Sequence, residues 1–76
     1  MNRPMTPGPM PFTSRQDLVV AMAADLVLYD AFRSETDAIR SLYGTRRYNM
    51  GYVMLCIDDA RQLAFQTVVA REMSDG

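Results

Sequence analysis

The longest apolar stretch of the chain runs from Leu18 to Phe32 and is interrupted only by Asp25 and Asp30. It contains neither glycine nor proline, so nothing in it breaks a helix. The Thr-Ser pair at 13–14 stands just before it and offers side-chain oxygens that can cap a first helical turn. The pattern therefore predicts a helix that starts at this pair and continues to the end of the apolar stretch.

Apolar side chains surround this predicted helix almost completely when they are plotted at about 100° per residue. A helix of that kind is buried on nearly all sides. One face is assigned to the core of the chain itself, and it comprises Val20, Ala21, Ala24, Leu28, Ala31 and Phe32. A chain of 76 residues has too few other helices to cover the rest, so the pattern predicts a homodimer. The residues expected in the dimer interface are Leu18, Met22, Leu26, Val27 and Tyr29.

A second helix over about residues 35–43 is predicted from Ser34 and Asp37, which have the spacing of a helix cap. Its apolar positions stay in phase with the first face of the preceding helix. The segment 13–43 therefore fits either two helices or one long kinked helix. Gly44 follows this segment and is expected to take the left-handed conformation that ends many helices.

A third helix is predicted from about Tyr48 to Met73, with Thr45 or Asn49 as its cap. Gly51, inside this helix, is expected to permit a close contact with another helix. Spacings of three and four place apolar residues along one stripe of the helix, namely Met50, Val53, Met54, Ile57, Ala60, Ala64, Phe65 and Val68.

Together these elements predict an all-α domain over residues 13–76. The expected fold is an antiparallel helical hairpin, in which two long helices are joined by a short one, and two copies pair into a dimeric helical bundle. Residues 1–12 contain all four prolines and predict an extended or disordered arm.

Composition argues against catalysis. The chain has no histidine and no lysine, which removes the usual general bases and Schiff-base formers. Cys56 is the only cysteine and lies between apolar residues, so we expect a buried, unreactive thiol. Three Asp-Arg pairs, at 30/33, 37/40 and 58/61, have the spacing of ion pairs on solvated helix faces. We therefore expect no enzyme, no cofactor and no metal.

The net charge of −1 lacks the basic excess of a small nucleic-acid binder. No apolar run is long enough to span a bilayer, and no secretory signal is visible, so a cytoplasmic protein is expected. All eight basic residues are arginine, which fits a GC-rich bacterial or phage genome.

The segment YGTRRYNMGY, residues 43–52, supports two interpretations. In the first it is a corner between helices, with Tyr43 and Tyr48 over the helix ends, their hydroxyls in solvent, and Arg46 and Arg47 exposed. In the second it is part of a helix-turn-helix that contacts duplex DNA through Arg46, Arg47, Tyr48, Asn49 and Tyr52.

The corner interpretation predicts a small regulator, an adaptor or inhibitor, that acts by binding another protein. Methionine side chains would give it an adaptable apolar surface. A DNA-binding regulator that uses residues 44–52 is the alternative. The partner-binding residues expected are Arg46, Arg47, Tyr48, Met50, Tyr52 and Met54.

Overall fold

The computed structural model describes residues 14–75, so the proline-rich arm predicted over residues 1–12 lies outside the described residues. The described part consists of three helices: α1 (Arg15–Leu28), α2 (Glu35–Gly44) and α3 (Met50–Asp75). It contains no strand. The predicted all-α fold, with a short helix between two longer ones, is confirmed.

The start of α1 is capped as predicted, because the Ser14 hydroxyl accepts a hydrogen bond from the Asp17 amide at 3.2 Å. The helix ends at Leu28, earlier than the expected Phe32. Asp30 has a φ of 52°, a left-handed conformation that aspartate tolerates better than most residues. The backbone N–H of Ala31 then donates to the Leu26 carbonyl at 2.9 Å. The chain therefore turns after Leu28, and α1 and α2 are two separate helices rather than one long kinked helix.

The turn between α2 and α3 is built differently from the expectation. Gly44 is the last residue of α2, and the left-handed position, with a φ of 62°, belongs to Arg46. Asn49 caps α3 by accepting a hydrogen bond from the Tyr52 amide at 2.9 Å. A Cβ at Gly51 would approach only the Asn49 side chain, at 3.3 Å, so this glycine serves the cap and not a contact between helices.

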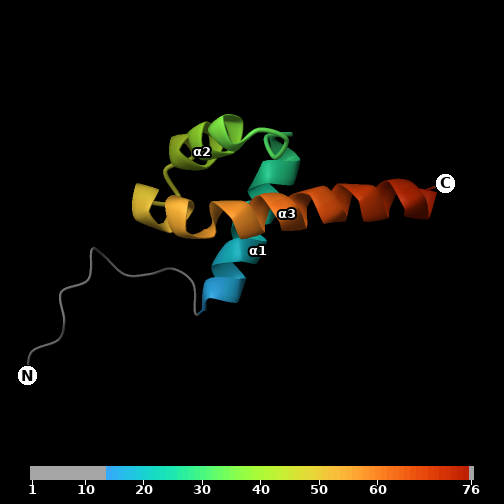
Figure 1. Cartoon of the computed structure of the whole chain (residues 1–76), viewed down its shortest axis with the longest axis horizontal. Helices are drawn as coiled ribbons and strands as arrows, with labels where there is room; N and C mark the ends of the chain where they lie inside the picture. The colour runs from blue at the N-terminus through green and yellow to red at the C-terminus, as the bar shows by residue number, and fades with distance from the viewer. Residues whose placement is uncertain (1–13, 76) are drawn as a thin grey trace, which may run out of the picture.

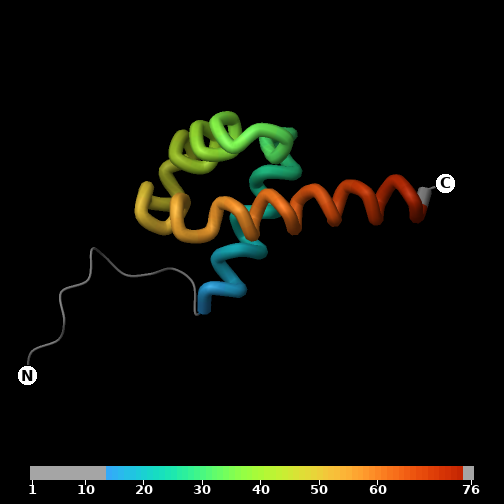
Figure 2. The backbone as a smooth tube through the Cα atoms, viewed as in Figure 1, coloured from blue at the N-terminus to red at the C-terminus, as the bar shows by residue number. Residues whose placement is uncertain are grey.

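The three helices are arranged around the first part of α3. Figure 1 shows α1 passing across α3, with α2 lying alongside the beginning of α3. The C-terminal part of α3 continues beyond both other helices, as the backbone tube in Figure 2 shows. One part of α3 is therefore enclosed by its neighbours, and the rest projects from the body of the domain.

The core lies where α1 and α2 meet the first half of α3. Every helix supplies fully enclosed side chains to it, and none of the largest is polar. On α3 the predicted stripe is only partly buried, because Met50, Met54 and Phe65 stay exposed. The largest fully buried side chains are Leu18, Met22, Leu26, Leu42, Val53 and Cys56.

The two faces of α1 are exchanged relative to the prediction. Leu18, Met22 and Leu26, expected in a dimer interface, are 0% exposed because α3 and α2 already cover them. Val20 is 48% exposed and Leu28 is 71% exposed, although both were assigned to the core. When apolar residues surround a helix, their pattern does not indicate which side faces the rest of the chain. The crossing of α1 and α3 determines which side is buried.

This assignment of faces predicts a difference between two leucines. Leu26→Ala should lower the free energy of unfolding by about 2–5 kcal/mol, because truncating an enclosed leucine leaves a cavity. Leu55→Ala, at an exposed position of α3, should change it by less than about 0.5 kcal/mol. Urea denaturation followed by circular dichroism measures both. Equal losses in the two variants would contradict the observed core.

Candidate protein-binding surface on α3

A buried carboxylate organises the corner at residues 43–52. Asp25 lies in the last turn of α1 and is only 8% exposed. The Tyr48 hydroxyl donates a hydrogen bond to Asp25 Oδ2 at 2.6 Å, and Arg47 Nη1 lies 3.0 and 3.1 Å from the two carboxylate oxygens. The corner is therefore tied to α1 by charge-assisted hydrogen bonds. The prediction that the Tyr48 hydroxyl is in solvent is wrong, whereas the Arg47 side chain is 54% exposed, as predicted, and is paired with Asp25.

Burial, with the hydrogen bond to Asp25, raises the pKa of the Tyr48 hydroxyl well above its ordinary value of 10.0. The hydroxyl therefore stays protonated and keeps its role as a donor. The Arg47 guanidinium also lies 5.4 Å from the centre of the Tyr48 ring, within the range of a cation–π contact. The aspartate inside an apolar run was the signal for this arrangement, since a buried carboxylate requires donors.

The remaining residues predicted to bind a partner lie at different depths. Arg46, Met50 and Met54 are exposed, whereas Tyr52 is half-buried and packs against the core. Tyr43 is exposed and does not cover the helix ends. The structure thus removes Tyr48 from the predicted surface and leaves Arg47 exposed but paired with Asp25. The two methionines at the start of α3 are also exposed.

Exposed side chains continue from these methionines along one side of α3. Met54 is 53% exposed and Phe65 is 57% exposed. They are eleven residues apart, which is three helical turns with an offset of about 20°, so they lie on the same side of the helix. Asp58 and Arg61 fall between them at spacings of four and three. We call these four residues, Met54, Asp58, Arg61 and Phe65, the α3 stripe.

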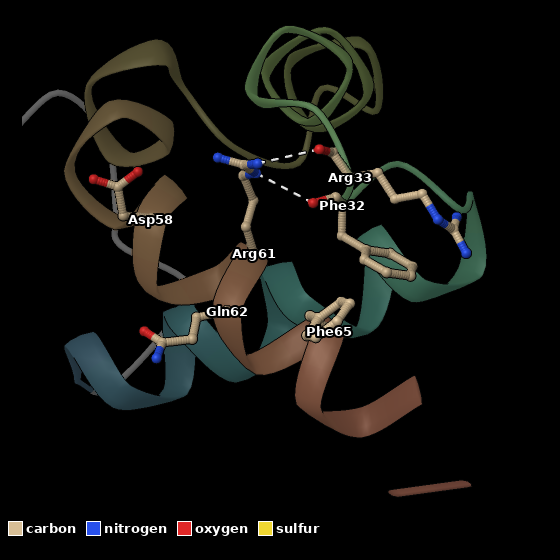
Figure 3. A pocket seen from close by; sticks show the side chains of 6 residues that line it. All are labelled: Phe32, Arg33, Asp58, Arg61, Gln62 and Phe65. Carbon is tan, nitrogen blue, oxygen red and sulfur yellow. Dashed lines mark hydrogen bonds between the residues drawn. The ribbon is translucent and has the colours of Figure 1, made fainter. Parts of the chain in front are cut away.

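A pocket of about 510 Å³ opens at the centre of the α3 stripe. In Figure 3, Phe32 and Arg33 come from the segment after α1, and the other lining residues come from α3. The rings of Phe32 and Phe65 are tilted by 59°, with their centres 6.4 Å apart. The lining residues are Phe32, Arg33, Asp58, Arg61, Gln62 and Phe65.

Arg61 holds the segment between α1 and α2 against α3. Its Nε donates to the Phe32 carbonyl at 3.2 Å and its Nη2 donates to the Arg33 carbonyl at 3.3 Å, as the dashed lines in Figure 3 show. The predicted pair of Asp58 with Arg61 is not formed among the described residues. The predicted pair of Asp30 with Arg33 is formed.

A second hollow, of about 350 Å³, lies between α1 and the projecting part of α3. On the α1 side it contains Val20 and Ala24, the exposed positions of the outer face of α1. Its full lining is Val20, Ala23, Ala24, Val27, Leu63, Thr67 and Arg71.

The structure offers little for catalysis or metal binding within residues 14–75. Cys56 is enclosed in the core, and burial raises the pKa of its thiol, which opposes formation of the nucleophilic thiolate. No cluster of metal-binding side chains is present in this part of the chain. None of its helices has the length and hydropathy needed to cross a membrane.

Comparison of the chain with protein-family models, with curated proteins and with solved structures finds no match.

The link between Tyr48 and Asp25 predicts the effect of removing one oxygen. Tyr48→Phe should lower the free energy of unfolding by about 1.5–3 kcal/mol, because the ring is kept while the buried carboxylate loses a donor. Tyr43→Phe, at an exposed tyrosine, should change it by less than about 0.5 kcal/mol. Urea denaturation at neutral pH measures both.

The same pair of variants has a second readout at alkaline pH. The unfolded chain releases the Tyr48 proton near pH 10, whereas the folded protein retains it to higher pH, so stability contributed by this group falls as pH rises above 10. Tyr48→Phe should weaken that decline and Tyr43→Phe should not. An unchanged decline in Tyr48→Phe would contradict the raised pKa.

Proposed function

We propose that this protein is a small non-enzymatic regulator, an adaptor or inhibitor, that acts by binding another protein through the α3 stripe. One observation carries the proposal. The side of α3 that faces α1 and α2 completes the core, yet Met54 and Phe65 remain exposed on another side of the same helix. Exposed apolar residues aligned along a helix are typical of surfaces that bind other proteins.

The chemistry of the α3 stripe supports a protein as its ligand. Methionine is flexible and polarisable, so Met54 can adapt to different apolar surfaces. Phenylalanine and arginine are enriched where proteins meet, and Phe65 and Arg61 lie one turn apart at the central pocket. A cytoplasmic location belongs to the same proposal and is supported by the single, unpaired cysteine.

The geometry favours a protein over duplex DNA as the partner. Tyr48 is enclosed and the charge of Arg47 is paired with Asp25, so one residue of the predicted DNA surface is buried and another is already in an ion pair. The α3 stripe carries Asp58, whose charge repels phosphates. Sub-micromolar binding of a duplex with a steep salt dependence, measured by fluorescence anisotropy and lost in Arg46→Ala, would support DNA instead.

The protein-binding proposal is tested by capture that depends on the α3 stripe. The full chain is immobilised and incubated with bacterial lysates, and captured proteins are quantified by mass spectrometry. Met54→Glu and Phe65→Glu should each reduce capture of a specific protein by tenfold or more. Leu55→Glu is the matched control, because Leu55 is equally exposed on α3 but lies outside the stripe.

The captured protein is then purified and titrated against the same variants by calorimetry. Its affinity for Met54→Glu and Phe65→Glu should be lower than its affinity for wild type and for Leu55→Glu, as in the capture experiment. Capture that is the same for all variants, or that is lost equally in Leu55→Glu, would contradict binding through the α3 stripe.

We also propose that the protein is a homodimer, with a second copy on the outer face of α1. Val20, Ala24 and Leu28 are spaced by four and exposed, so they form one line on that face. If two α1 helices cross antiparallel at Ala24, the small side chains meet at the centre, and Val20 of each copy contacts Leu28 of the other. This face is therefore self-complementary, as a two-fold interface requires.

The dimer is tested by sedimentation at micromolar concentration. The wild-type chain should give twice its mass of 8.6 kDa. Ala24→Glu should give a folded monomer, because a charge at the centre of the interface would be buried without a partner. Thr36→Glu, at an exposed position of α2, should remain dimeric. A wild-type monomer under these conditions would refute the dimer.

A further inference from the structure

Among the described residues, no carboxylate neutralises the charge of Arg61. The side chain is half-buried, and two of its nitrogens donate to backbone carbonyls, which carry no net charge. Within residues 14–75 no carboxylate lies within ion-pair distance of it. A guanidinium has five N–H donors, so further donors on Arg61 are available beside the pocket.

Aromatic surface lines the same pocket as this cation. Phe32 is mostly covered, whereas Phe65 leaves more than half of its surface exposed. Figure 3 shows the two rings together on one side of Arg61, whose side chain extends toward the carbonyls of the segment after α1. A ligand at this pocket can therefore contact a cation and an apolar surface at the same time.

The other charges at the pocket restrict the ligand. Arg33 lies over the Phe32 ring, at 4.7 Å from its centre, and is paired with Asp30, so its charge is largely compensated. Asp58 stands at the opposite edge of the pocket in Figure 3 and has no ion-pair partner among the described residues. A single carboxylate beside Arg61 is compatible with this arrangement, whereas a polyanion would also meet the charge of Asp58.

We propose that the pocket receives an acidic side chain of a partner polypeptide together with a neighbouring aromatic or aliphatic side chain. The carboxylate accepts hydrogen bonds from Arg61, and the apolar group packs on Phe65. This inference rests on the proposed function, because it specifies the chemistry of the partner at the centre of the α3 stripe. A carboxylate that meets a half-buried guanidinium forms a stronger hydrogen bond than one in solvent.

The inference is tested with small probes on the full chain by nuclear magnetic resonance. The probe is 3-phenylpropionate, which joins one carboxylate to one phenyl ring. It should bind saturably with a Kd on the order of 1–10 mM, as expected for a ligand of this size. The backbone amide signals that shift should be those of residues 32–33 and 58–65. The neutral analogue 3-phenylpropionamide should bind at least fivefold more weakly, and inorganic phosphate should produce no shifts at these positions.

Two variants separate the contributions of charge and ring. Phe65→Ala should weaken binding of 3-phenylpropionate at least fivefold while leaving the fold intact, because this side chain is exposed. Arg61→Gln should abolish the preference for the carboxylate over the amide. Arg61 also anchors the segment after α1, so the fold of Arg61→Gln is first compared with that of wild type by circular dichroism. If Arg61→Gln is unfolded, Phe65→Ala supplies the test. Arg40→Gln, at an exposed arginine of α2 that does not line the pocket, is the charge control and should bind within twofold of wild type.

Several results would overturn the inference. They are equal affinity for the carboxylate and the amide, undiminished binding by Phe65→Ala, or loss of binding in Arg40→Gln. Capture of a protein that depends on the α3 stripe, combined with no probe binding, would refute this partner chemistry and leave the proposed function standing. Probe binding without such capture would support this partner chemistry and contradict the proposed function.

Discussion

The arrangement of the three helices depends on one buried carboxylate. Asp25 is placed inside the apolar run of α1, where an unpaired charge would cost several kcal/mol. Its donors come from Arg47 and Tyr48, more than twenty residues later in the chain, just before α3. Satisfying this one group therefore holds the turn before α3 against one side of α1. The arginine and tyrosine that resemble a nucleic-acid surface are used for this internal purpose.

A second polar link lies just after the end of α1. Arg61 binds the carbonyls of Phe32 and Arg33, just after the left-handed turn at Asp30. These carbonyls follow the end of α1 and would otherwise need water as their donor. The two links together hold α1 and the segment after it against α3. Arg61 uses only the end of its side chain for these hydrogen bonds, so the pocket at Phe65 stays open.

The division of α3 into an enclosed part and a projecting part determines the exposed surface. Its core positions, such as Val53 and Ala60, are covered by α1 and α2, which cross or follow only the first part of the helix. Met54 and Phe65 lie on a side that neither helix reaches. The same geometry leaves the outer face of α1 uncovered, so a chain with a complete core still presents two apolar surfaces to other molecules. The proposed binding of other molecules rests on these two exposed surfaces.

Local features of the amino-acid sequence were sufficient to predict the elements. Ser14 and Ser34 cap helices as their spacing indicates, and Asn49 was one of two caps considered for α3. These are interactions between residues three positions apart, so they follow from local sequence alone. The enclosure of Cys56, between two apolar neighbours, was predicted for the same reason.

Only the tertiary structure decided the faces and the pairings. Leu26 and Leu28 are the same residue type on one helix, and their depths differ because α3 crosses one side of α1. Arg61 could reach Asp58 or the carbonyls after α1, and the fold brought the carbonyls closer. Likewise, nothing local joins Asp25 to Tyr48. The sequence by itself determined where helices form, because caps and periodicity act over a few residues; the candidate binding surface depends on contacts between distant segments, which exist only after the helices have packed.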